Sequence, residues 1–124
     1  MITINYKQRV HLDSIKDFSN LALKQGSSRP LGYYQVFSKR IKDKLFEVPS
    51  HIKEYRKHLS EEQLNNVAML EYIVKLTIDK GIKSNKSYTE IRCEVYRKID
   101  EFAELVGKSK IDEFNDSNYL KLVC

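Results

Sequence analysis

One stretch of this sequence decides its fold class: residues 87–107 read SYTEIRCEVYRKIDEFAELVG. Its apolar side chains recur at alternating steps of three and four, which is the period of a helix with one buried face; they are Tyr88, Ile91, Val95, Ile99, Phe102 and Val106. Ser87 and Glu90 have the spacing of a capping box, and Gly107 is a typical residue to end a helix. The stretch therefore predicts a long amphipathic helix.

A second capping box, Ser60 with Gln63, opens another long helical pattern that we expect to end at Gly81. Its apolar residues cover most of the circumference; they are Leu64, Val67, Ala68, Met69, Leu70, Ile73, Val74, Leu76 and Ile78. A helix that is apolar on most sides is buried on most sides. We therefore expect this helix to lie at the centre of a bundle.

The first half of the chain predicts shorter helices. Asp13 is placed to cap a helix that ends at Gly26, and Pro49 must follow the end of a second helix, because proline cannot continue one. The expected inward residues are Ile15, Phe18 and Ala22 in the first helix and Tyr34, Phe37, Ile41 and Leu45 in the second. Ser50 is expected to cap a short third helix, with Ile52, Tyr55 and Leu59 inside.

These patterns predict an all-α fold, a compact bundle of four or five helices that forms a single domain over residues 1–124. Ile2, Ile4 and Tyr6 alternate with polar residues, as in a strand. Residues 111–123 are ambiguous, because they suit either a helical turn or a strand. A short two-stranded ribbon that pairs the N- and C-termini is therefore an open alternative.

Composition favours an ordinary globular protein, with 41% apolar and 31% charged residues. The N-terminus has no continuous apolar segment of the kind found in signal peptides, and no apolar run approaches the length needed to cross a bilayer. We therefore expect a cytoplasmic protein without a membrane partner. Cys93 and Cys124 form no CxxC pair and are expected to be free thiols.

Residues 1–60 carry a net charge of +7 and residues 61–124 a net charge of −2, which together give the +5 of the chain. The basic residues that could hold phosphates are Lys39, Arg40, Lys42, Lys44, Arg56 and Lys57. Tyr33, Tyr34 and Tyr55 lie near them in sequence, and cations with aromatic rings are what a single-stranded nucleic acid requires. A nucleic-acid-binding accessory protein is therefore the alternative function, although a solvated helix face explains the same residues.

The segment from Leu76 to Tyr88 has the look of a helix-turn-helix turn. Its apolar residues after Gly81, however, fall one position too late for that motif. A plain helical hairpin explains the segment equally well, and we expect a hairpin.

The sequence contains no constellation typical of an enzyme. Cys93 has no histidine near it in sequence, and no serine lies in a G-x-S-x-G elbow. Four residues have helical metal-ligand spacing, namely His51, Glu54, His58 and Glu62, but Ser60 is expected to break that helix. We expect no catalytic residues, no metal and no cofactor.

The leading hypothesis is a small non-enzymatic regulator or adaptor that binds a protein partner. The loop from Gly26 to Gly32 is the candidate surface, because exposed loops on rigid helices commonly carry contacts. Arg29 is the expected anchor, and Pro30 restricts its backbone. Tyr33 and Tyr34 are expected to add aromatic area if either lies outside the core. A homodimer is also open as an oligomeric state.

Overall fold

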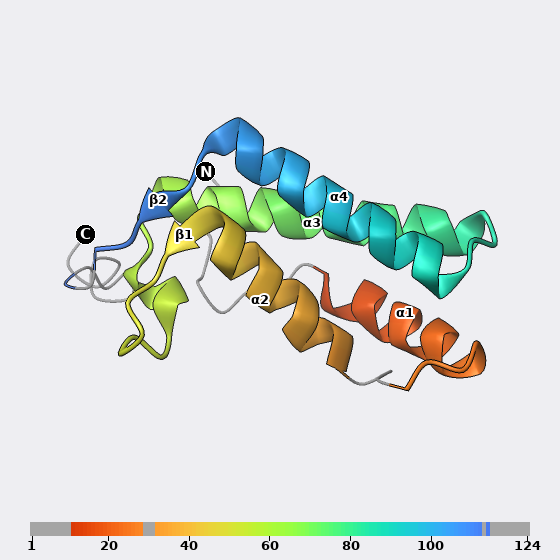
Figure 1. The fold of residues 1–124 in the computed structure, drawn as a ribbon. Helices are drawn as coiled ribbons and strands as arrows, with labels where there is room; N and C mark the ends of the chain where they lie inside the picture. The colour runs from red at the N-terminus through yellow and green to blue at the C-terminus, as the bar shows by residue number, and fades with distance from the viewer. Residues whose placement is uncertain (1–10, 29–31, 113, 115–124) are drawn as a thin grey trace.

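Four α-helices and one short 3-10 helix make up most of the chain in a computed structural model that describes residues 11–28, 32–112 and 114. The helices are α1 (Leu12–Lys24), α2 (Tyr33–Leu45), η2 (Tyr55–His58), α3 (Glu61–Lys83) and α4 (Tyr88–Val106). Two very short strands, β1 (Phe46–Glu47) and β2 (Ser109–Lys110), complete the described elements. The described fold is a bundle of four α-helices with a small sheet at one end (Figure 1), and the predicted all-α fold class is confirmed.

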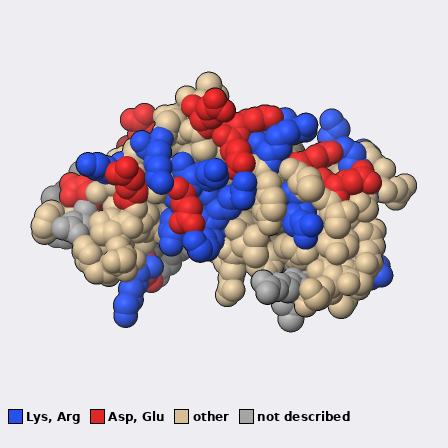
Figure 2. All heavy atoms as spheres, viewed as in Figure 1, with Lys and Arg blue, Asp and Glu red and all other residues tan. Residues whose placement is uncertain are grey.

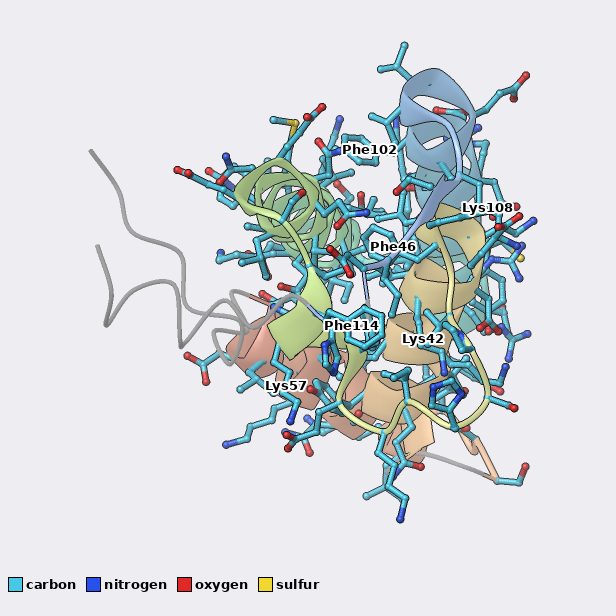
Figure 3. The ribbon with its side chains drawn as sticks, turned by 90° about the vertical axis from the view of Figure 1, so that its left-hand side faces the viewer. Lys42, Phe46, Lys57, Phe102, Lys108 and Phe114 are labelled. Atoms are coloured by element: carbon cyan, nitrogen blue, oxygen red, sulfur yellow. The ribbon has the colours of Figure 1, made fainter. Side chains whose placement is uncertain are left out.

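The predicted apolar stripes pack into a shared core. Figure 1 shows α3 and α4 side by side as a helical hairpin, with α1 and α2 packed along them. The buried stripe residues are Ile15, Phe18 and Ala22 on α1, Phe37, Ile41 and Leu45 on α2, and Ile91, Val95, Ile99 and Phe102 on α4. Phe102 lies between α3 and α4 (Figure 3), whereas Tyr88 and Val106, at the two ends of its stripe, are only partly covered.

The helix starts follow the sequence at two of the four predicted capping positions, Ser60 and Ser87. At Ser60 the capping box is complete: Ser60 Oγ accepts from the Gln63 N–H at 3.1 Å, and Gln63 Oε1 accepts from the Ser60 N–H at 2.9 Å. Ser87 Oγ likewise accepts from the Glu90 N–H. The predicted cap at Asp13 is wrong: α1 begins two residues earlier than predicted, with His11 at the cap position, and Asp13 lies in the first turn. Its negative charge still suits the helix N-terminus there.

The helix ends show where glycine matters and where it does not. Gly26 adopts a φ of +87° directly after α1, as predicted. The predicted end of α3 at Gly81 is wrong by two residues, because Asn85 takes the left-handed conformation instead, with a φ of +58°. The Lys86 N–H then bonds back to the Gly81 carbonyl at 3.0 Å, which closes the helix.

The helix α3 is buried on one face only, which corrects the expectation of burial on most sides. Its inward residues are Leu64, Val67, Leu70, Glu71, Val74, Ile78 and Gly81. Met69, Tyr72 and Leu76 are 55%, 52% and 47% exposed. Although α3 has 23 residues, no helix of the described chain combines the length and apolar character needed to cross a membrane.

The predicted short third helix is reduced to the single 3-10 turn of η2. Ser50 lies in a turn and does not cap it, and Ile52 and Tyr55 are only partly buried. Leu59 is fully buried, as expected. Ser60 caps α3 directly afterwards, so η2 is the only helical segment in the described stretch between Pro49 and α3.

The two short strands join segments that are far apart in sequence. β1 follows α2 directly, and β2 follows α4; they pair in parallel, with Phe46 opposite Ser109. Gln63 connects β2 to the start of α3, because its Nε2 donates to Lys110 O at 2.9 Å and to Ser109 Oγ at 3.0 Å. The ribbon considered for the two termini lies outside the described residues.

Candidate partner-binding surface

The loop favoured by the sequence is described only in part. Arg29 and Pro30 lie outside the described residues. Tyr33 is 5% exposed, packs edge-on against Phe18 with ring centroids 4.8 Å apart, and shares a hydrogen bond of 3.0 Å with Ser27 Oγ. Tyr33 is thus a core residue with little area for a partner, which corrects its assignment as a surface contact. Tyr34 is half-buried.

The basic cluster on α2 is largely neutralised by carboxylates. The guanidinium group of Arg40 donates two hydrogen bonds, of 3.1 and 2.7 Å, to the carboxylate of Asp100 on α4. Lys44 Nζ lies 3.9 Å from the same carboxylate. Lys39 pairs with Asp43 one turn along its own helix. The hydrogen bonds that Arg40 donates to Asp100 raise the pKa of Arg40 above its ordinary value, although desolvation opposes this. Three of the four predicted phosphate contacts on α2 therefore already have anionic partners.

The other two predicted phosphate-binding residues, Arg56 and Lys57, lie on η2. Arg56 is buried against Glu71, so the expectation that it lies on the surface is wrong. Figure 3 shows Lys57 well apart from Lys42 and Lys108 at this end of the molecule. Over the face seen in Figure 2, cationic and anionic side chains are interspersed. The six basic residues therefore do not form one continuous positive surface.

A wide hollow of about 690 Å³ lies beside the small sheet. Its lining is mixed: Lys42, Lys108 and Lys110 with Asp43 and Glu47 at the polar positions, and Phe46, Val48, Pro49, Ile52 and Ile111 at the apolar ones. Opposite charges close together offset each other, so the hollow favours neither a strongly anionic nor a strongly cationic ligand.

The thiol and the four residues with metal-ligand spacing that the sequence singled out do not form a site in the described part of the chain. Cys93 is a free thiol, as predicted, and it is exposed on α4. Ser60 separates His51, Glu54 and His58 from Glu62, as the sequence predicts, and the described residues bring no three metal-ligating side chains together.

The exposed face of α3 is different, because it presents apolar side chains in a continuous row. Met69, Tyr72 and Leu76 follow at steps of three and four, on the side of the helix opposite its buried face. Exposed polar residues continue the same line toward both ends of the helix. We call the whole line the α3 stripe; it consists of Glu62, Asn65, Met69, Tyr72, Leu76, Lys80 and Lys83.

The helix that carries the α3 stripe is fixed in place by its cap and by the packing of its other face. A complete capping box opens α3, and its other face is buried against α1 and α4. Sequence reasoning missed this surface because it assigned every apolar residue of α3 to the core. The signal that could have found it is the presence of two separate stripes on one helix, with Met69 and Leu76 on the face opposite Leu64 and Val74.

No family model matches this chain, and neither do the curated proteins or the solved structures with which it was compared.

Proposed function

We propose that this chain is a small non-enzymatic regulatory or adaptor protein that acts by binding a protein partner through the α3 stripe. The observation that carries the proposal is the continuous exposure of Met69, Tyr72 and Leu76 on a helix whose other face is fully packed. Single exposed apolar residues are common on protein surfaces, whereas a contiguous row marks a site of contact.

The residue types of the stripe suit a protein interface. Tyr and Met are enriched at the centre of such interfaces, and Lys and Glu are depleted there. Covering the exposed half of each apolar side chain would contribute roughly 1 kcal/mol. Glu62 and Lys83, at the two ends, would form a polar rim. This arrangement favours a partner that lies along the helix, as in recognition of one helix by another.

The nucleic-acid alternative has less support. A phosphate would have to compete with Asp100 for Arg40 and with Asp43 for Lys39. The pairing of these cations within the chain lowers the positive field that steers nucleic acids to a surface.

Affinity capture from the native host would test the proposal, with Leu76→Glu compared with Leu23→Glu. Leu23 is a matched control, because it is an exposed helical leucine on α1, next to the loop from Gly26 to Gly32. We expect Leu76→Glu to lose the partner and Leu23→Glu to keep it, with thermal melts confirming that both variants are folded. The opposite result would assign binding to the loop and refute the α3 stripe.

A further inference from the structure

We propose that the partner on the α3 stripe is a second copy of this chain, with the two α3 helices packed antiparallel about a two-fold axis near Tyr72. This inference rests on the proposed function and names its partner. It follows from the way in which the stripe is arranged around its own midpoint.

The α3 stripe is nearly symmetric in the character of its residues. Met69 and Leu76 lie at equal distances along the helix from the midpoint beside Tyr72, and Glu62 and Lys83 lie equally far from the same point. A two-fold axis at this midpoint therefore places each Met69 against Leu76 of the partner subunit. Two-fold dimers require such self-complementary surfaces, because the same patch serves both subunits.

The charges select the antiparallel direction. With this axis, Glu62 of each subunit faces Lys83 of the partner subunit, and the contact occurs twice. A parallel arrangement would place Glu62 near its own copy and Lys83 near its own copy, which is repulsive. Glu62 and Lys83 form no ion pair within the described part of the chain, so both charges can pair with the partner subunit.

The geometry of a long helix allows this contact. With 23 residues, α3 is roughly 34 Å long, since each residue adds 1.5 Å. A shallow crossing angle of about 20° keeps two such helices in contact over most of their length. One helix from each subunit buries less than a typical obligate dimer, so we expect a dissociation constant in the micromolar range.

Sedimentation velocity across a concentration series tests the inference with Glu62→Lys and Lys83→Glu. Each substitution alone places like charges at both symmetry-related contacts, so we expect the dissociation constant to rise about tenfold. Glu62→Lys/Lys83→Glu restores opposite charges and should return the dissociation constant to that of the unmodified chain. An equimolar mixture of the two single variants should form a heterodimer more stable than either homodimer.

Glu104→Lys is the control for net charge. Glu104 is exposed and lies one turn after Asp100, on the side of α4 where Asp100 contacts Arg40 of α2. The Glu104→Lys substitution changes the net charge by the same amount as Glu62→Lys. We expect this variant to dimerise like the unmodified chain. Equal weakening by Glu104→Lys would show that net charge alone governs association, and the inference would fall.

The result for the unmodified chain separates this inference from the proposed function. A monomer at all concentrations up to about 1 mM, well above a micromolar dissociation constant, overturns the second-copy inference. If Leu76→Glu still prevents capture of a different protein in that case, the proposed function stands without it. If the chain dimerises but neither Glu62→Lys nor Lys83→Glu changes the dissociation constant, the interface lies elsewhere and the antiparallel α3 packing is overturned.

Discussion

The guanidinium group of Arg56 faces the carboxylate of Glu71, with Nη1 3.3 Å from Oε2 and Nη2 3.5 Å from Oε1. Arg56 is 7% exposed and Glu71 only 2%. His11 Nδ1 lies 3.4 Å from the same Oε2. This buried cluster of three side chains connects η2 to the middle of α3 and to the residue that precedes α1.

Removal of one member of this pair should be costly, because the other charge remains buried without its partner. We expect Glu71→Ala to lower the free energy of unfolding by roughly 3–5 kcal/mol. Replacement of both, as in Arg56→Met/Glu71→Leu, should recover most of that loss, since two apolar side chains need no desolvated ion pair. Urea denaturation measures both variants, and a loss below about 1 kcal/mol for Glu71→Ala would contradict the buried-pair assignment.

Gly81 is the site of a close approach between α3 and α4. A Cβ added there would lie 2.6 Å from Ile91 Cγ1, which is closer than two carbon atoms tolerate. Alanine favours helix by about 1 kcal/mol over glycine, yet we expect Gly81→Ala to destabilise the domain by roughly 1–3 kcal/mol through overpacking. In a double-mutant cycle, Gly81→Ala should cost less when Ile91 is already alanine. Additive effects of the two substitutions would argue against the contact.

Ser14 links α1 to α3 through Asp79. Its hydroxyl donates to Asp79 Oδ1 at 2.7 Å, and Lys75 donates to the other oxygen at 2.7 Å. Partial burial opposes ionisation of Asp79, but these hydrogen bonds and the charge of Lys75 outweigh it, so the pKa of Asp79 lies below its ordinary value of 3.8.

A carboxyl group with a lowered pKa stabilises the folded state above the unfolded pKa, and this contribution disappears as the pH falls through the folded pKa. We expect Ser14→Ala to cost about 1 kcal/mol near pH 7. The difference from the unmodified chain should shrink as the pH falls below 3.8, where Asp79 begins to lose its charge. Thermal melts at several pH values measure this difference, and a difference that stays constant throughout the acid range below 3.8 would be inconsistent with the assigned bond.

Phe102 fills the space between α3 and α4 (Figure 3). Truncation of a buried aromatic side chain leaves a cavity, so we expect Phe102→Ala to lower the free energy of unfolding by roughly 3–5 kcal/mol. Phe114→Ala is the matched control, because Phe114 is 91% exposed and its loss should change stability little. Denaturant melts that rank the two variants equally would contradict the packing of α4.

The nucleic-acid alternative predicts steep salt dependence, with the slope reduced by about one unit for each phosphate contact removed. Because Arg40 and Lys39 have carboxylate partners, we expect no binding to single- or double-stranded DNA or RNA at about 150 mM salt. Asp100→Asn releases Arg40 and should increase any binding found at low salt. Tight binding at physiological salt in a gel-shift assay would instead favour the alternative.

The sequence by itself determined the four α-helices that the structure describes. The stripe from Ile91 to Phe102 and the cap at Ser60 depend on residues three or four positions apart, and backbone hydrogen bonds of a helix span the same distance. Gly26 and Gly107 were predicted as helix ends for the same reason, because the signal that ends a helix is local. The fold class follows from such local signals.

Only the tertiary structure decided which surfaces are available. Whether Arg40 is free depends on Asp100, 60 positions away, and whether Arg56 is exposed depends on Glu71. The parallel pairing of β1 with β2 joins two-residue strands that carry no periodic signal. The exposure of Met69 and Leu76 was decided in the same way: apolar character shows that a side chain favours burial, but the packing of α1 and α4 determined which face of α3 was covered.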